Sequence, residues 1–415
     1  MKLTDYEEAL LAGEMGEPRR QAMSRIVEIG RFFDAEDCVE VAQAHIMADT
    51  EALGEAGVEH LEGLAKYSEE DRWVKIPTIT DPRGADLNAY ERIKQDERFV
   101  SLERRAIDAF RALGVMMTDT CINYQTVLPP VKGEHLAMGD TGVVIYSNSV
   151  QGARTNYEGG PAALAAALTG RTARYGFHLD EKRRGTARFE LTEMPQDWAE
   201  WGALGGIVGN AMGSYFQVPV IDGVTGTVPT SDDLKHFGAA LASYGSTAMF
   251  HMIGVTPEAP DLGAVFDGPP PDPVTISRRD LTDFMASYGG GDDSLDVVVF
   301  AAPQLSVMEL EKLAGLMKGK RVHDGVSLLV ATNPENKSAA DRFGFTDAIE
   351  GAGGVVLEGV CFYQMHAREL GEANGWTRLM TNSAKLTNII GGYGYDPVLA
   401  DMERCVESAV AGRVV

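Results

Sequence analysis

Two cysteines stand where thiolates could hold iron. Cys121 follows the stretch GVMMTDT and Cys361 follows GGVVLEGV, so each is expected where a strand meets a polar turn. Thiolates in such positions are ligands for iron and for iron–sulfur clusters. A free cysteine is also a common small core residue, and this alternative stays open. Cys38 and Cys405 are far away in the chain and no CxxC pair occurs, which argues against a disulfide framework.

Polar side chains in a glycine-flanked loop could bind an acidic substrate. Arg154 is followed by Thr155 and Asn156, and Asn148 precedes it. A guanidinium group matches a carboxylate or phosphate with two parallel hydrogen bonds. A surface ion pair is the alternative interpretation. The segment 170–184, with GRTARYGFH and KRR, is the densest basic cluster, either an anion site or a solvated face.

A serine and a lysine near the C-terminus could act on a carboxylic acid. In TNSAK (381–385), Ser383 lies two residues before Lys385. A serine beside a lysine can act as a base, or the pair can anchor a carboxylate. Ser383 is equally suited to cap the start of a helix. No phosphate-binding loop, kinase signature or nucleophile elbow occurs.

Composition limits the classes of protein to which the chain can belong. Its 415 residues predict two or three domains. With 37 basic and 61 acidic residues the formal net charge is −24, which repels nucleic acid and anionic membranes. The N-terminus lacks the basic and apolar regions of a secretory signal, and glycines and polar residues interrupt the most apolar window, 203–221. We therefore expect a cytoplasmic globular protein.

Sequence patterns place the candidate residues on an α/β framework. Residues 1–70 read as helical, 73–81 as a strand and 92–113 as a helix. Short strands are expected within 114–125 and 142–149. An alanine-rich helix from Pro161 should end at Gly170.

The C-terminal part predicts a parallel sheet beyond a proline-rich linker, DGPPPD, at 267–272. Strands are expected at 295–303, 326–332 and 353–362, with helices from Ser306 and Ser338 between them. Ligands bind at the carboxyl ends of such strands, where Ala302, Thr332 and Cys361 lie. The expected division is an α/β region at 1–266 in two subdomains, a βαβ domain at 273–380, and a segment at 381–415 that returns to the active site.

Several stretches, taken in order, resemble the large subunit of aconitase X. The resemblance runs from near residue 5 to near residue 400 and is most specific in NSVQGARTN and GRTARYG. The stretches are HIMADTEALGEAGVEHLEGLA, IPTITDPRGADL, GVMMTDTCINYQ, GEHLAMGDTGVVIYSNSVQGARTNYEGGPAALAAALTGRTARYGFH, FGAALASYGSTAMFHMIGVTPEAP and TNSAK. An ordered match of this length is more specific than any single motif.

The resemblance implies an aconitase-like α/β fold of several α/β/α layers, an iron–sulfur cluster, and a hydro-lyase (dehydratase) activity on a small hydroxy acid. Members of the family act on cis-3-hydroxy-L-proline or mevalonate 5-phosphate. A small swivelling domain, fused or separate, completes their active site. The sequence contains no such domain, so a heterodimer with a separate small subunit is expected.

The resemblance also assigns roles to individual residues. Cys121 and Cys361 match cluster positions, whereas Ala302 in AAPQ stands where archaeal-type members have a cysteine in a GCPH-like stretch. This departure allows a smaller cluster, mononuclear iron or a non-catalytic ligand-binding subunit, and it favours cis-3-hydroxy-L-proline over mevalonate 5-phosphate. Iron would assist departure of the hydroxyl group. Arg154 and Lys385 would hold the substrate carboxylate, with Ser383 or a small-subunit residue as the base.

Overall fold

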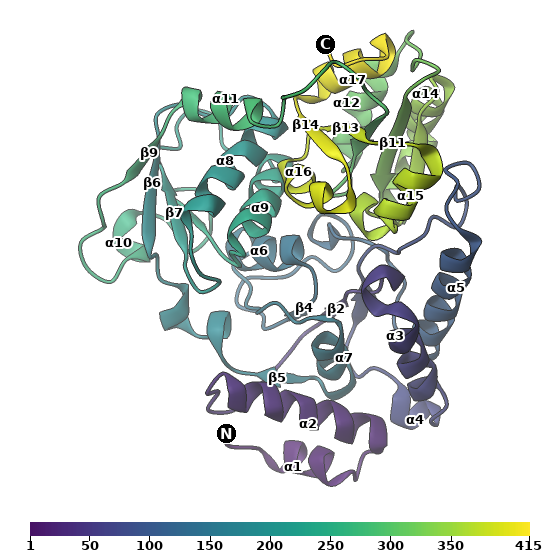
Figure 1. The fold of residues 1–415 in the computed structure, drawn as a ribbon. Coiled ribbons are helices and arrows are strands. Elements are labelled where there is room, and N and C mark those ends of the chain that lie inside the picture. Colours follow the sequence, from purple (N-terminus) through teal and green to yellow (C-terminus); the bar gives the residue numbers. More distant parts are fainter.

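The computed structural model describes residues 1–415, and its N-terminal part packs helices around a small parallel sheet (Figure 1). The strand order is β3-β2-β4, and both pairs are parallel. A second, antiparallel pair joins β1 to β5. The strands are β1 (Cys38–Glu40), β2 (Ala44–Ile46), β3 (Thr78–Thr80), β4 (Ala137–Met138) and β5 (Arg171–Ala173). The helices are α1 (Asp5–Ala12), α2 (Glu17–Phe32), α3 (Thr50–Ala65), α4 (Glu69–Arg72), α5 (Glu97–Ala112), α6 (Thr141–Ser149) and α7 (Gly160–Thr169).

The middle of the chain forms a four-stranded parallel sheet with the order β8-β7-β6-β9. Helices α8 and α9 pack on each other, and α11 packs on α8. The strands are β6 (Ala187–Leu191), β7 (Pro219–Asp222), β8 (His251–Met252) and β9 (Val274–Ile276). The helices are α8 (Trp198–Ala211), α9 (Ser231–Gly245), α10 (Leu262–Val265) and α11 (Arg278–Ala286).

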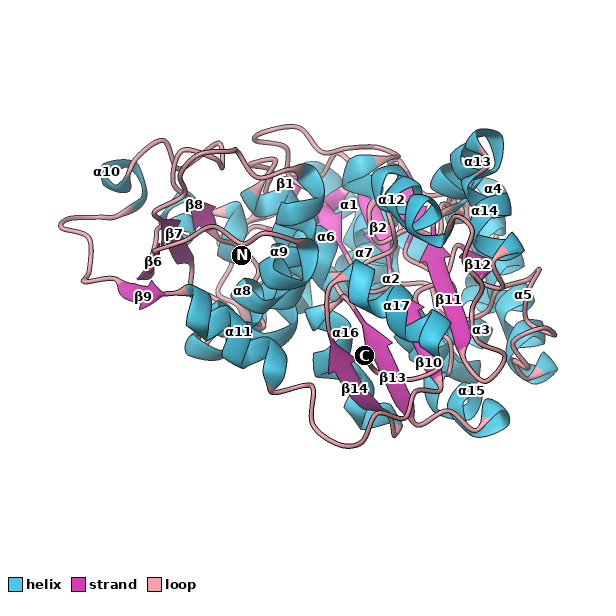
Figure 2. Cartoon of the chain, turned by 90° about the horizontal axis from the view of Figure 1, so that it is seen from above, coloured by secondary structure: helices cyan, strands magenta, loops and turns pink.

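The C-terminal part is a five-stranded parallel sheet with the order β12-β11-β10-β13-β14, and Figure 2 shows helices on both of its faces. Alternate residues of each strand enter different cores: Val298 packs on one face of the sheet and Val299 on the other. The strands are β10 (Val297–Phe300), β11 (Ser327–Thr332), β12 (Val355–Glu358), β13 (Arg378–Thr381) and β14 (Asp396–Leu399). The helices are α12 (Val307–Met317), α13 (Pro334–Phe343), α14 (Phe345–Gly351), α15 (Ala367–Asn374), α16 (Ala384–Ile390) and α17 (Met402–Ala411).

Several expected elements are present. The βαβαβ unit is formed by β10, β11 and β12, and α12 begins with the expected capping box of Ser306 and Glu309. Helix α7 has proline in its first turn and ends at Gly170 with a φ of 69°. No helix of the structure is both long and apolar enough to cross a membrane.

The two short strands expected before residue 150 are wrong. Residues 141–149 form helix α6, because the Asp140 carboxylate caps it by accepting hydrogen bonds from the backbone of Gly142 and Val143 at 2.8 and 3.0 Å. All eight residues from 142 to 149 are buried, so the helix has no polar face that could reveal its period. Within 114–125 only Met116 bridges to β3, and the left-handed φ of 50° at Asp119 turns the chain away.

The helical prediction for residues 1–70 holds for α1, α2 and α3, but the short strands β1 and β2 lie between α2 and α3. The proline-rich segment at 267–272 has no regular structure, as expected. It connects α10 to β9, and β9 pairs with β6, so one sheet includes strands from both sides of this segment.

A buried ionic network joins the middle part to the C-terminal sheet. The Lys235 ammonium group on α9 pairs with Glu309 on α12 and lies 3.1 Å from Asp232. His236 Nε2 lies 2.6 Å from Glu309 Oε1. Because all of these groups are buried, the network fixes the position of α9 against the start of α12.

Replacing Lys235 by methionine should therefore destabilise the protein strongly. The change leaves two buried carboxylates without their shared cation, which typically costs about 3–5 kcal/mol. Urea unfolding of Lys235→Met measures this loss. Lys312→Met is the control, because Lys312 makes a half-exposed pair with Glu403 and should cost about 1 kcal/mol or less. Equal losses in the two variants would contradict the prediction.

Candidate active site

The structure brings the two cysteines together. Cys121 lies in the loop that follows the Met116 bridge, and Cys361 lies just beyond β12. Both are buried and free, and they are close enough to influence each other's ionisation. The neighbouring Cys361 thiol and burial raise the pKa of Cys121 well above its ordinary value. Both thiols can therefore serve one ligand, which must displace a proton from Cys121.

The protein ligands for a metal at this place are two sulfurs. Ala302, beyond the end of β10, supplies no third thiol, and no group of three His, Cys, Asp or Glu side chains in the structure is arranged to hold a metal ion. The donor set therefore fits a centre that takes two protein thiolates. It does not fit one that needs three cysteines.

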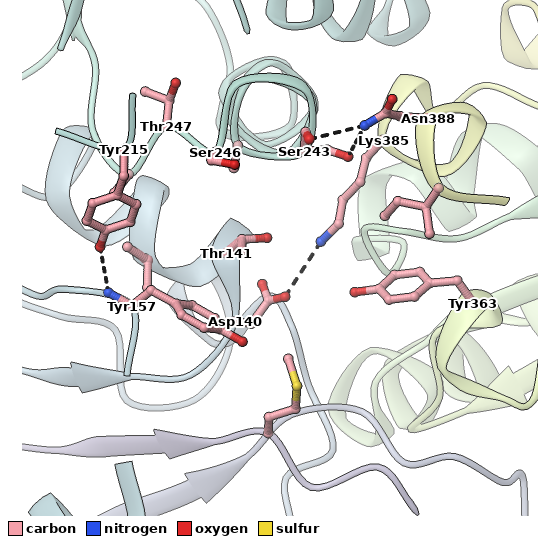
Figure 3. A pocket seen from close by; sticks show the side chains of 15 residues that line it. Asp140, Thr141, Tyr157, Tyr215, Ser243, Ser246, Thr247, Tyr363, Lys385 and Asn388 are labelled. Carbon is pink, nitrogen blue, oxygen red and sulfur yellow. Dashed lines mark hydrogen bonds and ion pairs between the residues drawn. The ribbon is translucent and has the colours of Figure 1, made fainter. Parts of the chain in front are cut away.

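A buried lysine–aspartate pair lies beside the thiols. Lys385, in the first turn of α16, places its Nζ atom 3.6 Å from Oδ2 of Asp140, the cap of α6 (Figure 3). Burial lowers the pKa of Lys385, but the neighbouring acidic groups, above all Asp140, outweigh this and raise it. The lysine is therefore a cation at neutral pH.

A cavity of about 500 Å³ opens onto this pair. Lys385 and Asp140 are its only charged residues, and in Figure 3 the hydroxyl group of Tyr363 points towards them. Burial raises the pKa of Tyr157, which also lines the cavity, to about 12, so its hydroxyl group keeps its proton. The other lining residues are Met47, Thr141, Val144, Tyr215, Ala242, Ser243, Ser246, Thr247, Ala248, Asn388 and Ile389. The cavity thus offers one cation and several hydroxyl groups to a small polar molecule.

Ser383 lies close to Lys385 in sequence but does not line the cavity. Its hydroxyl group donates to the carbonyl of Ala302 and accepts from the backbone of Leu386 as the cap of α16. Both hydrogen-bonding roles of the hydroxyl group are occupied, which favours the capping interpretation and leaves Lys385 as the proposed catalytic group.

Arg154 also lies outside the cavity. Its guanidinium group pairs with Asp180 and donates to the carbonyl of His178 at 3.1 Å. The other arginines of the basic cluster are paired as well, Arg174 with Asp37 and Arg183 with Glu258. The cluster is therefore built of ion pairs, and the structure does not support an anion site there.

The remaining expected substrate ligands are buried structural residues. The Asn148 side chain donates to the carbonyls of Thr155 and Ala248, both at 2.9 Å. The Thr155 hydroxyl group donates to the carbonyl of Asn156 at 2.7 Å. The Asn156 side chain donates to Tyr175 at 3.0 Å. These bonds hold the 148–156 loop in place, and none of these three side chains lines the cavity.

Sequence reasoning missed Asp140, Tyr363 and Tyr157. Asp140 carried a usable signal, since aspartate before an apolar run is a common helix start. The expected strand at 142–149 concealed it. Tyr363 lies two residues after Cys361, but nothing in its neighbours distinguishes it from a core aromatic residue.

Glu158, next to Tyr157, makes stability depend on pH. It is fully buried with one donor, the Thr172 hydroxyl group at 2.8 Å, and burial raises its pKa to about 7. Between pH 4.5, the ordinary pKa of a glutamate, and about pH 7, Glu158 keeps its proton in the folded chain and loses it in the unfolded chain. This group's contribution to stability therefore falls as pH rises through that window, by about 3 kcal/mol.

Glu158→Gln should remove this dependence. Relative to the parent, the variant should gain about 3 kcal/mol in free energy of unfolding between pH 4.5 and pH 8. Urea unfolding at both pH values measures the gain, with the exposed Glu311→Gln as the control. A gain that does not grow with pH would contradict the prediction.

Comparison with known proteins gives a consistent result. Three family models match in order: the aconitase X first domain over residues 1–181, the second over 185–286 and the third over 295–411. The phosphomevalonate dehydratase large subunit of Methanothermobacter thermautotrophicus is 36% identical over 95% of each chain. The cis-3-hydroxy-L-proline dehydratase of Pseudomonas aeruginosa is 32% identical over 99% of this chain and 70% of its own length. The crystal structure of Thermococcus kodakaraensis aconitase X (holo-form) has a TM-score of 0.87 and 29% identity, covering 99% of this chain and all of that one.

Proposed function

The chain belongs to the aconitase X family, and from this we propose that it is the large, catalytic subunit of a hydro-lyase that dehydrates a small hydroxy acid. Curated relatives along the whole chain are dehydratases. The observation that carries the proposal is that Cys121 and Cys361 lie next to each other and close to Lys385, whose side chain lines the cavity. Two sulfur ligands beside a buried cation match the two needs of the reaction, which are activation of a hydroxyl group and binding of a carboxylate.

Cys121 and Cys361 are the proposed ligands of the iron, either a small iron–sulfur cluster or a mononuclear ion. When bound, iron supplies a Lewis acid for the departing hydroxyl group. The absence of a third thiol at Ala302 supports a centre with two protein ligands.

Lys385 is proposed to bind the substrate carboxylate. Its Nζ atom lies 3.6 Å from Asp140, longer than an ordinary hydrogen bond, so its N–H donors are available to a ligand. Asp140 holds the ammonium group at the cavity wall, and the hydroxyl groups of Tyr157 and Tyr363 can donate to the same ligand. Dehydration then transfers the carbon-bound proton to a base and forms a double bond as the C–O bond breaks, and the departing hydroxyl group takes up a proton to leave as water. The proposed base belongs to the small subunit, because neither Ser383 nor any histidine lines the cavity.

A separate small subunit is proposed as the partner. Its support is that relatives covered over 94–95% of their length are named large subunits. Co-purification of this chain with the product of a neighbouring small reading frame tests the heterodimer.

The substrate favoured by the cavity is cis-3-hydroxy-L-proline. The one lining cation is balanced by Asp140, whereas a dianionic phosphate calls for several basic groups. Phosphomevalonate is the second candidate, because the relatives matched over nearly their full length act on it by name.

An anaerobic assay of the purified pair of subunits separates these candidates. We expect the purified pair to convert cis-3-hydroxy-L-proline to a pyrroline carboxylate at least about tenfold more efficiently than it dehydrates mevalonate 5-phosphate, because one missing charge contact costs a factor of this order. The reverse preference would overturn the choice of substrate. An iron-free, colourless protein that binds a small acid without turnover would indicate a ligand-binding subunit.

A further inference from the structure

Gln304 is a buried amide at the centre of the cysteine site that the proposed mechanism does not use. It follows β10 and is fully inaccessible to solvent. Its Oε1 atom accepts from the backbone N–H of Cys121 at 3.1 Å. Its Nε2 atom donates to the carbonyls of Asp119 at 3.0 Å and Val360 at 3.1 Å. Each of these hydrogen bonds thus joins the amide to backbone close to Cys121 or Cys361.

These contacts connect two segments that are far apart in the sequence, and Arg83 joins the same two segments through Asp119 and the carbonyl of Glu358. Asp119 and Cys121 belong to the loop of the N-terminal part, whereas Val360 directly precedes Cys361 in the C-terminal part. The backbone N–H of Gln304 also lies 3.4 Å from the sulfur of Cys121 and is directed at it. Gln304 is thus hydrogen-bonded both to Cys121 itself and to the residue that directly precedes Cys361.

Gln304 is itself held firmly. The buried Lys235 ammonium group donates to its carbonyl at 3.3 Å, and Leu305 donates to Ala331 of β11 at 2.9 Å. Ser383 donates to the carbonyl of Ala302, in the same loop. The backbone that carries Gln304 is thus anchored to the sheet, to α9 and to the start of α16, which limits the movement of its side chain.

We propose that Gln304 is a positioning residue that holds the thiols of Cys121 and Cys361 together so that both bind one metal centre. The inference rests on the proposed function, in which these two thiols are the iron ligands. A site with two protein ligands gains little from chelation by further side chains, so its affinity depends on how well the two sulfurs are arranged in advance.

The test uses Gln304→Met, which keeps the length of the side chain and removes the four amide hydrogen bonds, including the one that the Cys121 thiol donates to Oε1 at 3.8 Å. Gln95→Met is the matched control: the Gln95 amide is also buried, accepts from Asp86 at 3.3 Å and donates to Gly84 and Met365 at 2.7 and 3.1 Å, and it makes no hydrogen bond to Cys121, Cys361 or their direct neighbours. Each full-length chain is titrated anaerobically with cobalt(II), whose near-ultraviolet charge-transfer absorption reports the number of bound thiolates. Unfolding in urea is measured in parallel.

We expect the parent and Gln95→Met to show the absorption of two thiolates. Gln304→Met should bind cobalt at least about tenfold more weakly, or show the absorption of one thiolate, because residues supporting metal ligands typically change affinity by this factor or more. If Gln304→Met does not fold, Gln304→Glu keeps the acceptor for Cys121, loses both amide donors and should show the same weakening.

Three other results would count against the inference. Parent-like affinity and absorption in the folded Gln304 variant would overturn it and leave the proposed function standing. Equal weakening in Gln95→Met would show a general effect of lost stability. A parent chain without any thiolate absorption would overturn the metal site itself and the inference with it.

Discussion

Serine at position 121 or 361 should abolish both iron content and turnover. A serine hydroxyl group does not ionise near neutral pH and is a poor iron ligand, so each variant keeps one thiolate at a site that has no third sulfur to compensate. Loss of a Lewis acid removes several kcal/mol of stabilisation from the transition state, so kcat/KM should fall at least about a thousandfold. Iron per chain and initial rates of dehydration, measured on the anaerobically purified pair of subunits, check both parts.

Cys405 provides the control for these variants. It is buried in α17, inside the core on the far face of the C-terminal sheet, so Cys405→Ser should cost stability without loss of iron. A Cys121→Ser, Cys361→Ser double variant that contains no iron and turns over at the parental rate would end the proposed mechanism.

The C-terminal sheet was largely predictable because local signals agree with one another there. Strands β10, β11 and β12 are continuous apolar runs, as buried parallel strands should be, and the capping box at Ser306 marks the start of the first connecting helix. The same strand pattern predicted the position of Cys361 but not that of Cys121. Cys361 lies at a sheet edge, whereas the Cys121 loop reaches that edge from another part of the fold.

Helix α6 shows where pattern reasoning stops. Its residues are buried on every side, so the helical period has no polar counterpart, and Val143, Val144 and Ile145 favour a strand by their propensity. Only the cap at Asp140 favoured a helix. Burial in the folded protein outweighed the strand propensity of these residues. Asp140, which caps the helix, also lines the cavity.

Arg154 illustrates a different limit. Its residue type suits a carboxylate, and the carboxylate that it binds is Asp180 of the same chain. Lys385 differs because its neighbour Asp140 already caps a helix through one oxygen and lies 3.6 Å from the ammonium group through the other. Whether Arg154 or Lys385 is free to bind a substrate thus depends on where the acidic partner of each lies in space. In a sequence with so many acidic residues, these partners cannot be identified from the sequence alone.

Lys385→Met should reduce kcat/KM by about a hundredfold to a thousandfold, the usual cost of removing one buried charged donor from a reacting site. The methionine keeps the bulk of the side chain but leaves Asp140 facing the substrate carboxylate, so repulsion adds to the lost attraction. Cobalt charge-transfer absorption should persist, because Lys385 binds no metal, and this separates a substrate-binding defect from loss of the metal centre. The exposed Lys132→Met is the control and should keep parental activity. If folded Lys385→Met retained turnover within about twofold, the substrate carboxylate would have to be bound elsewhere, and the cation would have to come from the small subunit.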